Sequence, residues 1–180
     1  MAQPISRQAG VTLIEVMVSL ILTVVLLSAL VPLFASSIDS WQRGYSRSEV
    51  QQTARVAVDS MVRDLRYGRN FSKISDNEIA FTDSHGRSSR YRLDTTSHIL
   101  YNILSNGTPQ PVTGVNVKDS TNVLIYGNYG VAQALFDWPS APSGDDRDRA
   151  VYIYLTATDT VTGQSITIHT AVLSISRYLQ

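Results

Sequence analysis

The chain of 180 residues contains no cysteine, which excludes disulfides, thiolate nucleophiles and cysteine-ligated metal sites. Net charge is also missing, because 15 basic side chains balance 15 acidic ones. We therefore expect no strong electrostatic attraction to a polyanion such as nucleic acid.

Recognisable catalytic motifs are missing as well. The three histidines, His85, His98 and His169, lie far apart and without the spacing of metal ligands. The sequence has no Gly-x-Ser-x-Gly elbow, no phosphate-binding loop and no zinc motif. It therefore predicts a protein that is not an enzyme and that needs no cofactor.

Charge is absent from one long stretch in particular, residues 16–38. A helix of that length spans a hydrocarbon core of roughly 30 Å. A secretory signal usually has a shorter apolar region of about 7–15 residues. Ala35-Ser36-Ser37 offers a small-residue cleavage site, but the length of the run favours a membrane-spanning helix.

Glu15 is the exception at the edge of this apolar segment. An acidic side chain at the bilayer centre costs about 2.5–3.5 kcal/mol, and less near the interface, so an acid in the membrane usually has a partner or a function. One interpretation is an interfacial Glu at the end of a plain anchor. The other is that Glu15 has a dedicated role.

A short polar leader, residues 1–10, precedes the apolar segment and ends at Gly10. The sequence Gly10-Val11-Thr12-Leu13-Ile14-Glu15 resembles the processing motif of type IV prepilins. That resemblance implies that a prepilin peptidase cuts between Gly10 and Val11, that Val11 becomes N-methylated, and that Glu15 is fifth in the mature chain.

The resemblance also gives Glu15 a partner, because the pilin family implies pairing of this carboxylate with the terminal ammonium of a neighbouring subunit. Pro32 falls where many type IV pilins have a helix-bending Pro. Val11 departs from the Phe that is frequent in major pilins. Arg7 before the span and Arg43 and Arg47 after it oppose the implied orientation by the positive-inside rule, so orientation rests on the resemblance.

Beyond the span, residues 39–67 contain no proline and place an apolar stripe at helical spacing, formed by Ala54, Val58, Met61, Val62 and Leu65. Gly68 then offers a helix stop. Short β-branched and aromatic runs separated by turn residues follow. The expected strands are residues 78–82, 89–93, 99–104, 123–126, 151–158 and 165–175, with a hairpin turn at Thr162-Gly163.

The sequence therefore predicts an α+β fold, in which a long N-terminal helix with a membrane-spanning half and an amphipathic half packs on an antiparallel, β-rich pilin head. We expect a leader at residues 1–10, a membrane and assembly half at 11–38, an amphipathic half at 39–68 and a head at 69–180. Residues 55–66 are similar to the helix end of PilW-type minor pilins and GspJ-type pseudopilins. Residues 91–94, 100–101 and 171–173 resemble β-segments of the same proteins.

Two further surfaces invite a ligand interpretation. Asp145, Asp146 and Asp148 place carboxylates in one polar loop, suitable for calcium, but Arg147 and Arg149 are interleaved and oppose a cation. A solvated charged loop is favoured there, and no metal is predicted.

A basic strand is the second such surface. Arg87, Arg90 and Arg92 with Tyr91 would suit DNA, as a DNA-uptake subunit needs. The balanced net charge argues against it, and a solvated strand face is the simpler interpretation.

The predicted function is that of a minor pilin or pseudopilin, a structural subunit of a type IV pilus or a type II secretion pseudopilus that primes assembly or lies near the tip. The implied partners are other subunits, prepilin peptidase, the inner-membrane assembly platform and membrane lipid. The implied location is the bacterial inner membrane, crossed once with the head exported, and then the filament. The alternative is a membrane-tethered exported domain with a binding or hydrolytic task, such as DNA uptake or adhesion, in which Glu15 is incidental.

Overall fold

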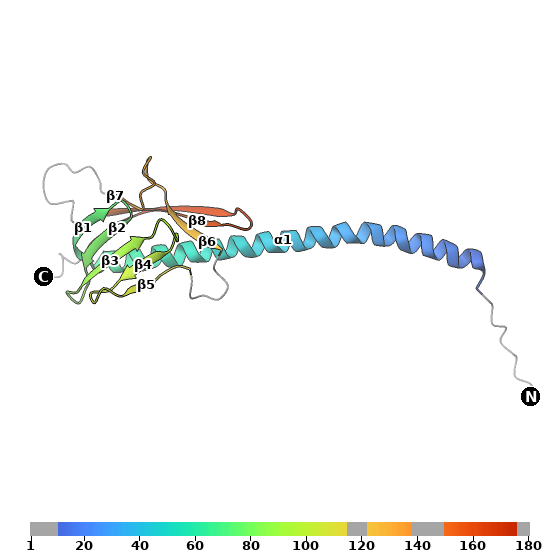
Figure 1. Cartoon of the computed structure of the whole chain (residues 1–180), viewed down its shortest axis with the longest axis horizontal. Coiled ribbons are helices and arrows are strands. Elements are labelled where there is room, and N and C mark those ends of the chain that lie inside the picture. Colours follow the sequence, from blue (N-terminus) through green and yellow to red (C-terminus); the bar gives the residue numbers. More distant parts are fainter. Residues whose placement is uncertain (1–10, 115–121, 138–149, 176–180) are drawn as a thin grey trace, which may run out of the picture. The chain divides into compact units, whose positions relative to one another are not determined.

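The computed structural model describes residues 11–114, 122–137 and 150–175. The chain forms two units, Met1–Gln42 and Arg43–Gln180. One helix, α1 (Leu13–Tyr67), begins in the first unit and ends in the second (Figure 1). The predicted long N-terminal helix is thus confirmed, although it begins two residues after Val11.

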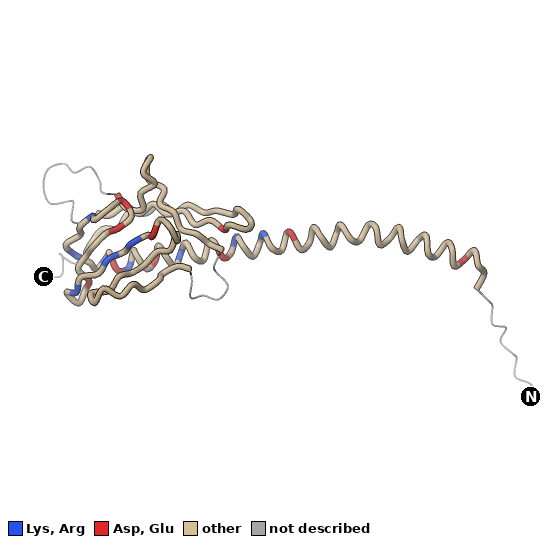
Figure 2. The backbone as a smooth tube through the Cα atoms, viewed as in Figure 1, with Lys and Arg blue, Asp and Glu red and all other residues tan. Residues whose placement is uncertain are grey.

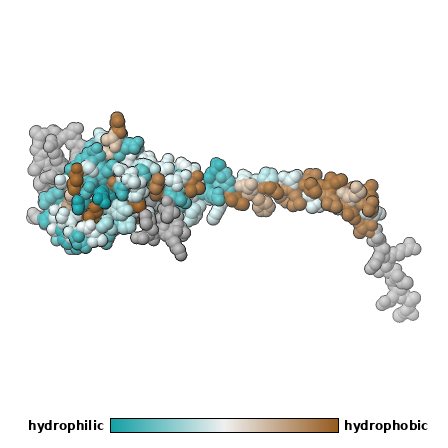
Figure 3. Space-filling model, in the orientation of Figure 1, coloured by the Kyte–Doolittle hydropathy of each residue, from teal (hydrophilic) through white to brown (hydrophobic). Residues whose placement is uncertain are grey.

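The part of α1 in the first unit is apolar on all sides. No charged residue lies between Glu15 and Asp39 (Figure 2), and its surface is largely hydrophobic (Figure 3). None of its most apolar window is buried against the rest of the described chain, and the helix is long and apolar enough to cross a membrane. A helix that is hydrophobic all round needs an apolar surrounding, which lipid or other subunits supply.

The part of α1 in the second unit buries one face. Ala54, Val58, Met61 and Leu65 of the predicted stripe are buried, and Val62 packs at the margin of the core. Their spacing of three and four residues places them on one side of the helix. The buried face also includes Ser46, Val50 and Ala57.

The helix stops at Tyr67, and Gly68, which follows it, is packed closely against its neighbours. A Cβ on Gly68 would lie 3.0 Å from the ring of Phe81 and 3.1 Å from the carbonyl oxygen of Asp64. A larger residue would require these neighbours to move by a few tenths of an ångström. The helix ends directly before Gly68, so the predicted stop is confirmed.

The first sheet has five antiparallel strands in the order in which they occur in the chain. It forms because each strand is joined to the next by a short turn, the simplest antiparallel connection. The strands are β1 (Arg69–Ser75), β2 (Glu78–Thr82), β3 (Ser88–Leu93), β4 (Leu100–Ile103) and β5 (Pro109–Pro111).

The second sheet is built around the long strand β8 (Ala150–Asp159). Strands β6 (Val123–Gly127) and β7 (Phe136–Asp137) pair with one side of β8, and β9 (Ser165–Leu173) pairs with the other. Thr162-Gly163 lies in the turn between β8 and β9, as predicted, and Gly163 adopts a positive φ of 70°.

Both sheets and the second part of α1 share one hydrophobic core. Met61 of α1, Ile79 and Leu100 of the first sheet, and Ile125 and Ile153 of the second sheet are each essentially inaccessible to solvent. The predicted α+β class is therefore confirmed, with an antiparallel β-rich head.

Three strands, β1, β5 and β7, were not predicted from the sequence. β1 is largely polar, β5 contains two prolines, and β7 has only two residues, so none shows the alternation that identifies a strand. The predicted strands at 78–82, 89–93, 99–104, 123–126, 151–158 and 165–175 are present with ends shifted by at most two residues. The polar loop containing Asp145, Asp146 and Asp148 lies outside the described residues.

Candidate processing and assembly segment

The residues after Gly10 form a capped helix start. Gly10 lies outside the described residues, and Val11 and Thr12 precede the first residue of α1. The Glu15 N–H donates to the Thr12 side-chain hydroxyl at 3.3 Å, and the Val16 N–H donates to the Thr12 carbonyl at 3.2 Å. Thr12 is therefore the N-cap, and Thr12-Leu13-Ile14-Glu15 has the spacing of a capping box.

Glu15 occupies the first turn of α1 and is exposed. A carboxylate there lies near the partial positive charge of the helix N-terminus, which stabilises it by about 0.3–1 kcal/mol. That gain is smaller than the roughly 2.5–3.5 kcal/mol cost of an acid at the centre of a bilayer. The helix alone therefore does not offset membrane burial of Glu15, and a cationic partner would.

Four hydroxyl side chains in the apolar part of α1 are hydrogen-bonded within the helix. Ser19 donates to the Glu15 carbonyl and Thr23 to the Ser19 carbonyl, each at 2.7 Å. Ser28 and Ser37 donate to carbonyls three and four residues earlier, at 2.7 and 2.9 Å. Hydroxyls bonded in this way can enter hydrocarbon without losing a partner.

Pro32 lies inside α1, which continues on both sides of it. Its ring removes one backbone donor, so the carbonyl of Ser28 loses its usual partner four residues on. In a spanning helix that loss favours a bend. Pro32 therefore lies within a continuous helix, and the bend that the sequence predicts at this position stays a prediction.

Two aromatic side chains that the sequence reasoning passed over follow the apolar run. Trp41 is 71% exposed and Tyr45 is 57% exposed, one helical turn apart on α1. Trp and Tyr are enriched where a spanning helix leaves the bilayer. Their position just after Ile38 could have been recognised in the sequence as a membrane-interface signal.

The basic strand considered for DNA does not form an aromatic surface. Tyr91 is 1% exposed and points into the core, on the opposite face of β3 from Arg90 and Arg92. Arg90 pairs with Glu78 at 3.3 Å. A buried ring cannot stack on a base, so Tyr91 does not form the aromatic part of the DNA surface that was considered and disfavoured from the sequence.

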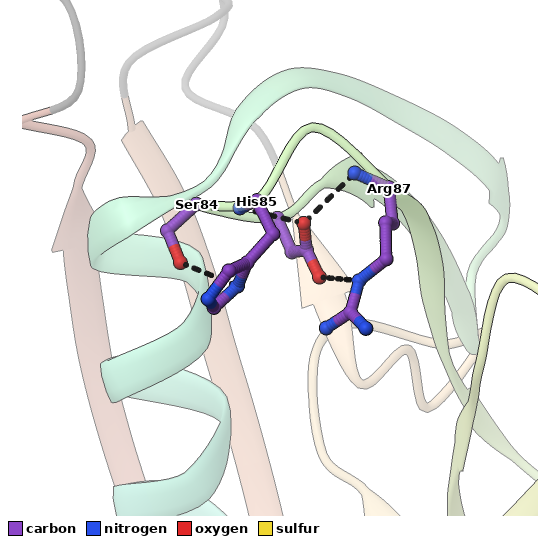
Figure 4. Close-up of polar contacts among 4 residues, drawn as sticks. Ser84, His85 and Arg87 are labelled. Atoms are coloured by element: carbon purple, nitrogen blue, oxygen red, sulfur yellow. Dashed lines mark hydrogen bonds and ion pairs between the residues drawn. The ribbon is translucent and has the colours of Figure 1, made fainter.

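Arg87 belongs to a self-contained turn between β2 and β3 (Figure 4). The side chain of Asp83 accepts the N–H groups of His85 and Arg87 at 2.9 and 2.8 Å, and the Arg87 Nε at 3.0 Å. Burial acts to raise the pKa of Asp83, but these hydrogen bonds and the charge of Arg87 outweigh it and lower the pKa. These hydrogen bonds thus stabilise the hairpin of β2 and β3, and they hold the Arg87 side chain against Asp83 within the turn.

The histidines are not brought together. His85 contacts Ser84 at 3.3 Å, His98 packs on Tyr126 with ring centres 4.2 Å apart, and His169 packs on Tyr154 at 5.0 Å. Among the described residues no group of His, Asp and Glu side chains is arranged to hold a metal ion.

Taken together, these features define an α+β protein whose apolar N-terminal helix is long enough to cross a membrane. Residues 5–31 match the family described as the prokaryotic N-terminal methylation motif. This motif is typical of type IV prepilin-like proteins, and it contains Gly10, Val11 and Glu15. No curated protein and no solved structure matches the chain.

Proposed function

We propose that this chain is a minor pilin or pseudopilin: a structural subunit that is cleaved after Gly10, methylated on Val11 and assembled into a type IV pilus or a type II secretion pseudopilus. Its partners are prepilin peptidase, the inner-membrane assembly platform and other pilin-like subunits. The head is exported, and the subunit primes assembly or lies near the filament tip.

The observation that supports this most is the position of Glu15. It is the only charged residue between Arg7 and Asp39, it is exposed on the first turn of α1, and it lies within the matched methylation motif. A plain anchor gains nothing from an acid there, whereas a subunit that must leave the membrane does. Cleavage after Gly10 creates a terminal ammonium on Val11, four residues from Glu15.

Assembly then follows from the two opposite charges near the start of each helix, the Val11 ammonium and the Glu15 carboxylate. The Glu15 carboxylate of an incoming subunit pairs with the Val11 ammonium of a subunit already in the filament, which removes two uncompensated charges from lipid. The apolar faces of neighbouring helices replace lipid contacts, and the missing hydrogen bond at Pro32 lets the helix adapt its curvature.

The test compares three full-length chains in the native cells: the unmodified chain, Glu15→Gln and Val18→Ala. Glu15→Gln keeps the size of the side chain but removes the charge, and Val18→Ala is a neutral change in the same part of α1. We expect all three chains to lose residues 1–10 and gain one methyl group by mass spectrometry. Only Glu15→Gln should fail to enter sheared filaments or a cross-linked pseudopilus fraction.

The rival function is a tethered exported domain that binds a ligand while the leader stays attached. A chain that keeps its leader in cells with active prepilin peptidase would contradict the pilin proposal and favour that rival. Equal incorporation of Glu15→Gln and the unmodified chain would show that Glu15 has no part in assembly.

A further inference from the structure

Strand β9 forms an edge of the second sheet that differs from the other strand edges of the head. It has nine residues, none of them Asp, Glu, Lys, Arg, Pro or Gly. It pairs with β8 through nine consecutive residue pairs without a bulge. Long, flat, uncharged edges readily accept another strand, and proteins usually block them.

The other edges of the head are blocked. β1 has two register irregularities and contains Arg69 and Lys73, and β5 has three residues, two of them proline. The other two edges are covered by backbone hydrogen bonds. The Ile125 N–H of β6 donates to the His98 carbonyl at 3.0 Å, and the Phe136 N–H of β7 donates to the Asp76 carbonyl at 3.1 Å.

The direction of the backbone groups of β9 follows from β8. The Tyr154 N–H donates to the Leu135 carbonyl at 2.9 Å, and the Tyr154 carbonyl accepts the Asn128 N–H at 3.2 Å, so both groups face away from β9. Opposite residues of an antiparallel pair turn these groups the same way, both toward each other or both apart. His169 is opposite Tyr154, so its N–H and C=O point outward.

The N–H and C=O groups alternate in direction along a strand, so every second residue of β9 points these groups outward, as His169 does. Ser165, Thr167, Ala171 and Leu173 share the orientation of His169, and their side chains are also exposed. Among the described residues no strand pairs with this outer side of β9. β9 thus presents a complete row of donors and acceptors for an added strand.

β9 also runs in the same direction as the second part of α1. Its beginning adjoins Ser46, because Thr162 in the preceding turn lies 2.5 Å from the Ser46 hydroxyl. Just after its end, the Ile175 N–H donates to the Arg66 carbonyl at 2.9 Å. Nine strand residues span about 30 Å, and 20 helical residues span about the same length, so the two elements lie side by side.

This direction restricts what can add to β9. Among the described residues a second copy offers only its own β9 as an open edge, and antiparallel pairing of two β9 strands would reverse one α1 relative to the other. Two subunits anchored in one membrane need helices that run the same way. Two copies in one membrane therefore cannot pair their β9 strands antiparallel, which is the more stable arrangement per residue. A strand of a different protein can pair with β9 in this way.

We propose that the outer edge of β9 binds an extended, uncharged strand from a different subunit anchored in the same membrane, which continues the second sheet across the subunit boundary. This inference rests on the proposed function. Backbone hydrogen bonds from the outward N–H and C=O groups of β9 supply the affinity. The edge then specifies a neighbour of another kind, as a subunit present in few copies requires.

The test places a photo-reactive benzoylphenylalanine at position 169 of the full-length chain in its native cells. Cross-linked peptides are identified by mass spectrometry in four backgrounds: no further change, Thr167→Val, Thr167→Pro and Ala171→Lys. Thr167→Pro removes one outward N–H without touching the ladder to β8, and Thr167→Val keeps that N–H. Ala171→Lys leaves the backbone intact and adds a charge at the edge.

We expect a cross-link to an uncharged segment of a different pilin-like subunit. Its yield should fall roughly tenfold with Thr167→Pro, the effect of about one lost hydrogen bond, and fall similarly with Ala171→Lys. Thr167→Val should leave it unchanged. The melting temperature of each purified chain in detergent confirms that the head is folded, and Ala171→Lys keeps the test decisive if Thr167→Pro does not fold.

Three results would overturn the inference: a cross-link to a second copy of this chain, no cross-link to any subunit, or a cross-link that survives both Thr167→Pro and Ala171→Lys. The mature N-terminus is measured in the same samples. A chain that is cleaved and methylated but gives no cross-link contradicts the β9 inference alone, whereas an uncleaved chain contradicts the proposed function.

Discussion

Tyr91 of β3 donates its phenolic hydrogen to the carboxylate of Asp64 on α1 at 2.6 Å. The ring of Tyr91 is buried in the core, stacked on Phe81 at 5.8 Å, so the hydroxyl is held against the helix. This bond ties the first sheet to α1 close to the end of the helix. A second bond, from Ser46 of α1 to Asp159 of β8, ties the second sheet to the beginning of the same helical segment.

Replacing Tyr91 with Phe should lower the free energy of unfolding by about 1.5–3 kcal/mol, because a hydrogen bond to a charged group is lost while the packing is kept. Chemical denaturation of the full-length chain in detergent measures this. Tyr101→Phe, on neighbouring β4, is the matched control, since the described residues give its hydroxyl no partner. Equal losses from the two variants would contradict a special role for the bond to Asp64.

The pH dependence of Tyr91 provides a separate prediction. Burial, followed by the hydrogen bond and charge of Asp64, raises the pKa of Tyr91 above its ordinary value of 10.0. Its contribution to stability is therefore complete below pH 10 and is lost as the pH rises further toward the folded-state pKa. Melting temperatures measured from pH 9 to 11.5 should fall more steeply for the unmodified chain than for Tyr91→Phe. Parallel curves would count against the raised pKa.

Asp159 should make the head sensitive to acid. Burial acts to raise its pKa, but hydrogen bonds from Ser46, the Val161 N–H and Thr162 outweigh burial and lower the pKa below 3.8. A lowered pKa stabilises the folded state above the unfolded-state pKa, and this stability is lost as the pH falls through the folded-state value.

Replacing Ser46 with Ala should reduce the acid sensitivity that Asp159 causes. It should also lower the free energy of unfolding at neutral pH by about 1.5–3 kcal/mol, because a hydrogen bond to a charged group is lost. Thermal unfolding from pH 7 down to pH 2 measures both effects. Ser37→Ala is the control, because the Ser37 hydroxyl bonds only within the first part of α1. An unchanged pH profile in Ser46→Ala would contradict the role of this bond.

Gly127 and Gly44 should respond oppositely to alanine. A Cβ on Gly127 would lie 2.1 Å from the Gln133 carbonyl oxygen, which no relaxation of a side chain can relieve, whereas nothing lies within 4 Å of a Cβ on Gly44. We expect Gly127→Ala to lower the melting temperature or abolish folding. Gly44→Ala should stabilise the helix by up to about 1 kcal/mol. Two changes of the same sign would be inconsistent with this packing.

The predicted bend at Pro32 can be measured because the chain has no cysteine. Leu20→Cys and Trp41→Cys would place two spin labels on either side of Pro32, about 32 Å apart along a straight helix. Replacing Pro32 with Ala restores the missing hydrogen bond and should lengthen the distance between the labels in detergent micelles. Leu33→Ala is the control. An identical distance with and without Pro32 would show that the helix has no bend at that position.

Much of the secondary structure is evident from the sequence because its causes are local. The strand at Glu78–Thr82 and the helical stripe of Ala54, Val58, Met61 and Leu65 show the periods of a pleated strand and of a helix. β7 forms for a different reason. Its two residues are extended because β8 lies on one side and Asp76 on the other, and no property of Phe136 or Asp137 indicates this.

The sequence by itself determined the apolar helix, the methylation motif and the isolated charge of Glu15, since each depends on residues that are neighbours in the chain. The tertiary structure alone decided that Tyr91 is buried against Asp64 rather than exposed beside the arginines, and that β9 lies at an open edge. Burial of one face and the order of strands in a sheet depend on contacts between residues far apart in the chain. Local sequence patterns do not predict those contacts, so the candidate subunit interface at β9 could be identified only from the tertiary structure.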